Sequence, residues 1–141
     1  MLTTVEKVIF LQDIDIFEFT STEDLSHIAA ITDEIEFKAD ETICKEGAIP
    51  DAMYMVYEGK VRLSRGDQEL MIAGHKETFG TWALFDEEPL VMTATAVGDA
   101  RLLRIKKDDF VDLLADHVKI TQSILKTMVK RLRRLMTRAR A

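Results

Sequence analysis

The chain of 141 residues contains one cysteine, two prolines and no long apolar run. The single cysteine, Cys44, excludes an internal disulfide and suits a reducing compartment. No segment approaches the roughly 20 apolar residues that span a bilayer. The first residues, from Met1 to Lys7, lack the basic segment of a secretion signal. We therefore expect a cytoplasmic protein without a transmembrane segment.

Acidic residues are absent after Asp116, although the whole chain has a formal net charge of −6. The segment after Asp116 holds eight basic residues and therefore carries a charge of +8. Residues 1–116 carry −14, because 11 basic and 25 acidic residues lie there. Any proposed function must explain this contrast between an acidic body and a basic C-terminal segment.

Recognisable catalytic and metal-binding patterns are also missing. His27, His75 and His117 are far apart in the sequence, and none has a ligand or nucleophile at a known spacing. We interpret them as surface residues, and Cys44 as a small strand residue. We expect no enzyme activity, no catalytic residue, no metal and no cofactor.

The sequence does contain clear helix signals at its start. Thr3 to Glu6 has the pattern of a capping box and predicts a helix through about Leu11. The run from Thr20 to Glu23 predicts a second helix. Its apolar face is formed by Leu25, Ile28 and Ala29, which are spaced at the helical period.

The periodicity changes at Ile35 and again near Asp108. Between them, short apolar or alternating runs are separated by turns such as Glu58-Gly59 and Arg65-Gly66-Asp67, which is typical of a barrel or sandwich. We predict one domain over 1–141, mainly β with flanking helices. Its parts are N-terminal helices over 1–34, an antiparallel β-roll (jelly roll) over 35–105 and two C-terminal helices over 106–141.

Several segments resemble, in order and spacing, the cyclic nucleotide-binding superfamily, which includes the bacterial catabolite activator and the regulatory subunits of cAMP-dependent kinase. The resemblance covers most of the chain. The segments that carry it are Ile16-Phe17, Glu23-Asp24-Leu25, residues 40–47, residues 53–61, residues 79–95 and Arg101-Leu102-Leu103-Arg104-Ile105, followed by the two closing helices.

The resemblance implies an eight-stranded β-roll with a ligand cassette of the form Phe-Gly-Glu-x-Ala-Leu, then Pro-Arg-x-Ala-Thr/Ser. In that family the Glu holds the ribose and the Arg pairs with the cyclic phosphate. Here the Glu position is Thr81. The Arg position is Leu90 without a gap, or Met92 if two residues are inserted, whereas Thr93 keeps the hydroxyl. The candidate pocket residues are Phe79, Gly80, Thr81, Trp82, Ala83, Leu84, Leu90, Val91, Met92 and Thr93.

The charges of this segment also indicate, without reference to the family, that it lacks a cation to pair with a phosphate. From Glu77 to Ala100 the sequence has no Lys or Arg, whereas it has five acidic residues, Glu77 included. One interpretation is a vestigial pocket in which Thr81, Trp82 and Leu90 pack, and another is a pocket for a different, more apolar ligand. The backbone amides of Trp82, Ala83 and Leu84 offer a weak substitute for the missing cation. Arg62 and Arg65 are distant arginines that would have to reach in.

The basic C-terminal helix has three interpretations. It is a solvated face around an apolar stripe, a dimerisation helix, or a helix that lies on an anionic membrane or nucleic acid. The spacing of Leu125, Met128, Leu132 and Leu135 is that of a heptad seam and predicts a homodimer, which is also what the resemblance to the catabolite activator implies. No helix-turn-helix follows Ala141, so we expect no specific nucleic-acid binding. We expect instead a regulatory or interaction module that acts through an output domain or partner protein and does not bind cAMP or cGMP in the standard way. The alternative is a working sensor with a non-standard pocket.

Overall fold

The computed structural model describes residues 1–140. Contacts divide the chain into two compact units. The first contains Met1 and Ile31–Val111, and the second contains Leu2–Ala30 with the described residues from Asp112 onward.

The first unit contains eight antiparallel strands in two four-stranded sheets. The first sheet has the order β1-β8-β3-β6, with β1 at Thr32–Phe37, β8 at Ala100–Lys106, β3 at Ala52–Glu58 and β6 at Thr78–Phe79. The second has the order β2-β7-β4-β5, with β2 at Thr42–Cys44, β7 at Thr93–Ala96, β4 at Val61–Arg65 and β5 at Gln68–Ala73. The mainly β prediction with helices before and after the strands is therefore confirmed.

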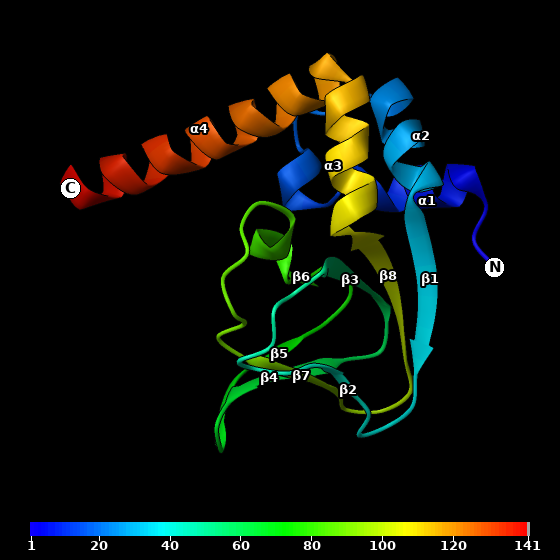
Figure 1. Cartoon of the computed structure of the whole chain (residues 1–141), viewed down its shortest axis with the longest axis vertical. Helices are drawn as coiled ribbons and strands as arrows, with labels where there is room; N and C mark the ends of the chain where they lie inside the picture. The colour runs from blue at the N-terminus through cyan, green and yellow to red at the C-terminus, as the bar shows by residue number, and fades with distance from the viewer. Residues whose placement is uncertain (141) are drawn as a thin grey trace. The chain divides into compact units, whose positions relative to one another are not determined.

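The first strand begins at Thr32, earlier than the expected Ile35. Thr32 to Glu34 lack the alternating pattern that marked the predicted strand, but they continue the β1–β8 ladder, where Thr32 lies opposite Ile105. Figure 1 shows these two strands side by side. Pairing with a neighbouring strand thus extends β1 beyond what its own sequence indicates.

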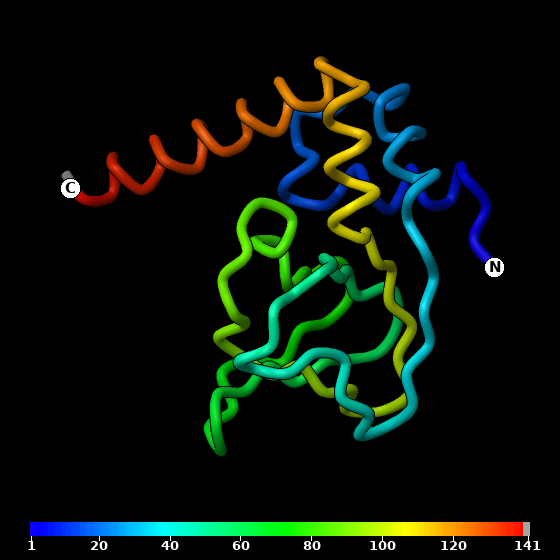
Figure 2. The backbone as a smooth tube through the Cα atoms, viewed as in Figure 1, coloured from blue at the N-terminus to red at the C-terminus, as the bar shows by residue number. Residues whose placement is uncertain are grey.

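The two sheets share an apolar core. The buried residues of this core come from six strands and are Val56, Val61, Leu63, Ala73, Phe79, Ala94, Ala96, Ala100 and Leu102. The turn after β3 contains Gly59, whose φ of +89° favours glycine. A Cβ on Gly59 would meet the Asp99 carbonyl oxygen at 2.7 Å, so the turn also needs the missing side chain. Figure 2 traces the path between β6 and β7 in green, which includes the 3-10 helix η2 at Thr81–Leu84.

The second unit is helical. Its elements are α1 at Thr4–Leu11, η1 at Asp15–Phe17, α2 at Thr22–Ala30, the end of α3 (Lys107–Asp116) and α4 at Val118–Arg140. The predicted capping box is present, because Thr3 Oγ1 accepts the Glu6 N–H at 3.1 Å and Glu6 Oε1 accepts the Thr3 N–H at 3.0 Å. These bonds to Thr3 lower the pKa of the Glu6 carboxyl. The predicted apolar face of α2 is buried.

Histidines 27 and 117 differ from the expectation of isolated surface residues. Both are half-buried, and their ring centroids lie 4.3 Å apart, which joins α2 to the segment between α3 and α4. No cluster of three or more His, Cys, Asp or Glu side chains among residues 1–140 forms a metal site. None of the helices within the same residues combines the length and apolar character that crossing a bilayer requires.

Candidate functional site

The candidate cassette lies between β6 and the start of β7. Phe79 is buried in the core, and Gly80 follows it with a φ of +76°. A Cβ on Gly80 would approach the Ala52 carbonyl oxygen to 2.9 Å, so the chain passes directly over β3 at this point. Thr81 then begins the four-residue η2, in which Ala83 and Leu84 are buried.

The short helix η2 has fewer free backbone N–H groups for an anion than the sequence indicated. The Ala83 N–H donates to the Gly80 carbonyl at 3.0 Å, so this amide is already bonded within the turn. Trp82 does not pack over a pocket, because 74% of its surface is exposed. The expectation that Trp82 helps fill a vestigial pocket is therefore wrong. The fully buried neighbours in this turn are the smaller Ala83 and Leu84, which anchor it to the unit.

The second half of the cassette is held against the loop that follows β2. The Leu90 N–H donates to the Ala48 carbonyl at 2.9 Å, and the Gly47 N–H donates to the Leu90 carbonyl at 2.8 Å. The Thr93 hydroxyl accepts the Glu46 N–H at 3.0 Å. These two backbone hydrogen bonds therefore fix the position of the Leu90 backbone, and with it the point from which the Leu90 side chain extends.

The two alternatives for the arginine position have different surroundings. Leu90 lines a cavity of about 190 Å³ together with Gly80. Met92 is half-buried and packs against the core cluster of the roll. Val91 lies between them and is half-exposed. No described residue at any of these three positions supplies a positive charge.

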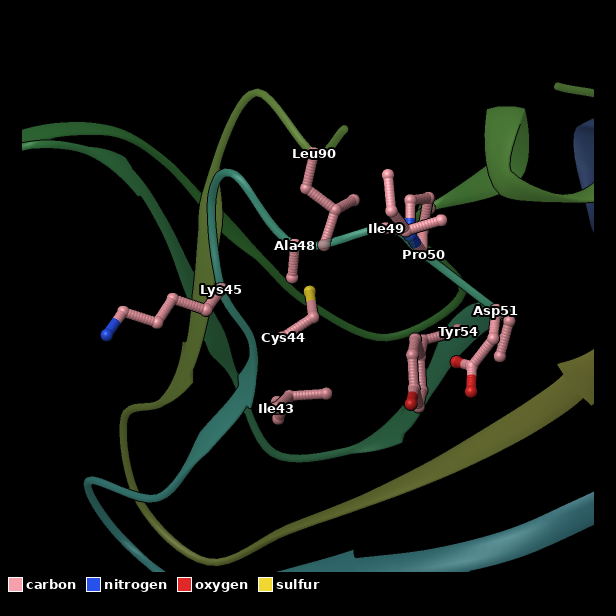
Figure 3. Close-up of a pocket in the computed structure, with 11 residues that line it drawn as sticks. Ile43, Cys44, Lys45, Ala48, Ile49, Pro50, Asp51, Tyr54 and Leu90 are labelled. Carbon is pink, nitrogen blue, oxygen red and sulfur yellow. The ribbon is translucent and has the colours of Figure 1, made fainter. Parts of the chain in front are cut away.

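The cavity has both polar and apolar walls. Figure 3 shows the sulfur of Cys44 and the phenol of Tyr54 among its walls, and the Lys45 side chain pointing away from the other labelled residues. The lining residues are Ile43, Cys44, Lys45, Ala48, Ile49, Pro50, Asp51, Ala52, Tyr54, Gly80 and Leu90. Cys44 lies in β2, as expected, and burial raises the pKa of its thiol.

The two arginines that the sequence suggested as distant donors are already engaged. Arg62 forms an ion pair with Glu69 at 3.1 Å. The Arg65 Nε–H donates to the Val91 carbonyl at 3.1 Å, so its guanidinium lies beside the cassette backbone.

A third arginine, which sequence reasoning missed, is the cross-strand neighbour of Tyr54, one of the cavity-lining residues. In the register of the first sheet, Arg104 of β8 is opposite both Asp33 of β1 and Tyr54 of β3. Its Nη2 approaches Asp33 Oδ2 at 3.3 Å. The signal was present in the alternation of β8, because Arg104 is two residues after the buried Leu102 and so shares its face.

Comparison with known proteins agrees with this architecture. The profile of the family described as Cyclic nucleotide-binding domain matches residues 34–117. The chain belongs to this family.

Relatives of this cyclic nucleotide-binding domain include a CRP-like cAMP-activated global transcriptional regulator of Mycobacterium tuberculosis. It is 31% identical over 117 residues, which cover 77% of this chain and 52% of the relative. A cAMP-dependent protein kinase regulatory subunit of Aspergillus fumigatus is 29% identical over 107 residues, which cover 74% of this chain and 26% of that subunit. The domain thus spans about half of the first relative and about a quarter of the second.

A solved structure also resembles the domain over nearly its whole length. It is the N-terminal domain of a transcriptional regulator from Streptomyces coelicolor, with a TM-score of 0.84 and 26% identity. The alignment covers 92% of this chain and 94% of that one. The cyclic nucleotide-binding fold therefore includes both the strands and the flanking helices.

The C-terminal helix α4 divides its apolar residues between two faces. Ile120 and Ile124 are buried, as is Thr127. Three of the four predicted seam residues, Leu125, Leu132 and Leu135, are 58–61% exposed, and Met128 is half-buried. Three of the four seam residues are thus left exposed within the single chain.

Proposed function

We propose that this chain is a regulatory or interaction module that does not hold cAMP or cGMP through the standard charged contacts. The observation that carries the proposal is the apolar Leu90 at the cavity wall, in a cassette without any Lys or Arg between residues 77 and 100. Hydrogen bonds to charged groups contribute roughly 1.5–3 kcal/mol each. Loss of a two-bond arginine contact lowers affinity by about a hundredfold or more.

The size of the cavity supports the same proposal. Its volume of about 190 Å³ is below the roughly 300–1,000 Å³ of typical ligand pockets. Isothermal titration with cAMP and with cGMP tests the proposal directly. We expect no heat of binding at micromolar nucleotide, and a clear micromolar isotherm would contradict it.

We further propose that the module acts as a homodimer through Leu125, Met128, Leu132 and Leu135 and that it passes its signal to an output domain or partner protein. The exposed seam on α4 supports the dimer. We expect no enzyme activity of its own, and two of the matched relatives are named as a transcriptional regulator and a kinase regulatory subunit. The single cysteine suits the reducing cytoplasm, where we place the protein.

The second candidate function is a sensor with an altered pocket. Arg65 favours it, because its guanidinium is bonded to the Val91 carbonyl and so reaches the cassette from β4. Titration of an Arg65→Met variant separates the two candidates. If a cyclic nucleotide binds the unchanged chain and this variant loses it, the sensor with a non-standard cation replaces the first proposal.

A further inference from the structure

The turn after β6 presents two exposed aromatic side chains. Trp82 is largely exposed and Phe85 is partly exposed. The Phe85 N–H donates to the Trp82 carbonyl at 3.0 Å, and residues three apart in a 3-10 turn lie on the same side, so both rings begin on one side of the turn. The Phe85 ring also packs edge-on against Phe110 of α3, with centroids 5.7 Å apart, which holds the turn in place. Exposed aromatic residues are enriched where one protein binds another.

Three exposed acidic residues, Asp86, Glu87 and Glu88, continue this turn. The cation that contacts them is Lys107, whose Nζ donates to the Asp86 carbonyl at 2.8 Å and lies 4.0 Å from a Glu87 carboxylate oxygen. The Asp86 and Glu88 carboxylates form no ion pair among the described residues. The two rings are therefore followed by a negatively charged segment, which suits a partner with positive charge.

An open groove of about 610 Å³ adjoins this turn. It lies between the loop before β3 and the first residues of α3, and Glu87 lines it as well. Four of its charged lining residues are acidic and two are basic, namely Asp51, Glu87, Asp108 and Asp109 against Lys106 and Lys107. The exposed Ile49 adds an apolar wall. We call this groove, together with Trp82, Phe85 and residues 86–88, the acidic docking surface.

Helix α4 supplies the complementary charge within the same chain. Residues 1–116 carry −14, whereas the residues that follow carry +8 and include no acidic residue. Part of this positive charge is used inside the helical unit, because Arg131 lies 3.4 Å from Asp15 and Arg134 lies 3.6 Å from Glu18. Charge complementarity therefore makes a second copy of this chain the occupant that best fits the acidic docking surface.

One exposed face of α4 has the side chains that such a contact needs. Val129, Arg133 and Met136 are spaced four and three residues apart, so they lie on one side of the helix. All three are exposed, and Arg133 forms no ion pair among the described residues. A guanidinium stacks well on the face of a tryptophan ring and pairs with carboxylates, whereas the two aliphatic side chains suit an apolar wall. This face therefore matches Trp82, the acidic turn and Ile49 in chemistry.

We propose that the acidic docking surface of one copy binds the Val129, Arg133 and Met136 face of α4 from a second copy. This inference rests on the proposed homodimer and extends it. Val129 and Met136 lie directly beside the seam and Arg133 lies further round the helix, so the paired helix leaves Arg133 free to contact the partner's body. The same contact gives the acidic body and the basic C-terminal segment a shared role.

Fluorescence of Trp82 tests this proposal in the unchanged chain, because Trp82 is its only tryptophan. As protein concentration rises through the range in which light scattering detects the dimer, emission should shift to shorter wavelength and acrylamide quenching should weaken. A dimer in which Trp82 stays as accessible as in the monomer overturns the inference and leaves the homodimer standing. Protection already present in the monomer would assign α4 of the same chain as the occupant, which also overturns it. A monomer at every concentration contradicts the proposed homodimer itself, and the inference with it.

Charge reversals locate the contact. Arg133→Glu or Glu87→Lys should raise the protein concentration at which Trp82 becomes protected by about three- to tenfold, whereas the two together should restore it. Arg138→Glu is the matched control, because Arg138 is also exposed but lies on another side of α4. Equal losses in Arg133→Glu and Arg138→Glu, or no recovery in the combined variant, would overturn the assignment. Rising salt should also expose Trp82 while the dimer persists, because screening weakens the ion pairs of the docked face.

Discussion

Leu90 and Ala48 are joined by a 2.9 Å backbone hydrogen bond, with the Leu90 N–H as donor. This bond ties the second half of the cassette to the loop after β2 and leaves the Leu90 side chain at the cavity wall. An arginine in place of Leu90 would extend from the same fixed backbone position. Substitution at Leu90 therefore tests directly whether the absence of the family's charged side chains explains weak nucleotide binding.

The double substitution Thr81→Glu and Leu90→Arg should create cAMP binding. It places the ribose acceptor and the phosphate partner at the positions that the family resemblance implies. An uncompensated arginine in an apolar cavity costs stability. The empty variant should therefore melt earlier than the unchanged chain and recover when cAMP is added, which differential scanning fluorimetry measures.

Thr81→Glu with Met92→Arg is the control for the alternative alignment. Met92 packs against the core cluster, so arginine there should destabilise the roll without creating a site. Recovery with cAMP in the Met92 variant but not in the Leu90 variant would favour the alignment with two inserted residues. If neither binds, the small cavity itself excludes the nucleotide, because Trp82 is too exposed to block it.

The exposed seam of α4 predicts a dimer that depends on Leu132 and Leu135. Replacing both by Glu should convert the dimer to a monomer, as measured by light scattering coupled to size exclusion. Val111→Glu is a matched control, since Val111 is also exposed but lies on α3. Basic residues flank the seam, so the dimer of the unchanged chain should tighten as salt rises. A monomer at high protein concentration in both low and high salt would refute the dimer.

Gly80 should not tolerate alanine. Its φ of +76° is unfavourable for other residues, and a Cβ would meet the Ala52 carbonyl oxygen at 2.9 Å. We expect Gly80→Ala to lower the free energy of unfolding by roughly 1–3 kcal/mol in chemical denaturation. Gly47→Ala is the control, because Gly47 has a φ of +86° but no atom within 4 Å of the added Cβ. Equal losses would show that the close approach to β3 is unimportant.

Alkylation of Cys44 should be slow at neutral pH. Burial raises the pKa of its thiol above the ordinary value of 9.0, so the thiolate forms only at higher pH. The rate with iodoacetamide should therefore keep rising above pH 9.0, with a midpoint above that value. Because the folded chain holds this proton more tightly than the unfolded chain, the contribution of Cys44 to stability is complete below that pH and is lost as the pH rises through the raised pKa. A midpoint at or below 9.0 would show that the cavity exposes the thiol to water.

The sequence by itself determined the elements whose signals are local. Helix α1 follows from the Thr3–Glu6 box, and the turn at Gly59 follows from a residue that tolerates a positive φ. The strand region was also predictable, since short alternating runs are separated by turn residues. The absence of a cation in the cassette is a property of composition and needed no coordinates.

Only the tertiary structure decided which side chains meet. Thr32 extends β1 because β8 lies beside it, and Trp82 is exposed because Ala83 and Leu84 anchor its turn. Asp33, Arg104 and Tyr54 are far apart along the chain, and cross-strand register brings them into one row. Register depends on how whole strands pair and pack their buried faces, which no local pattern around Arg104 specifies.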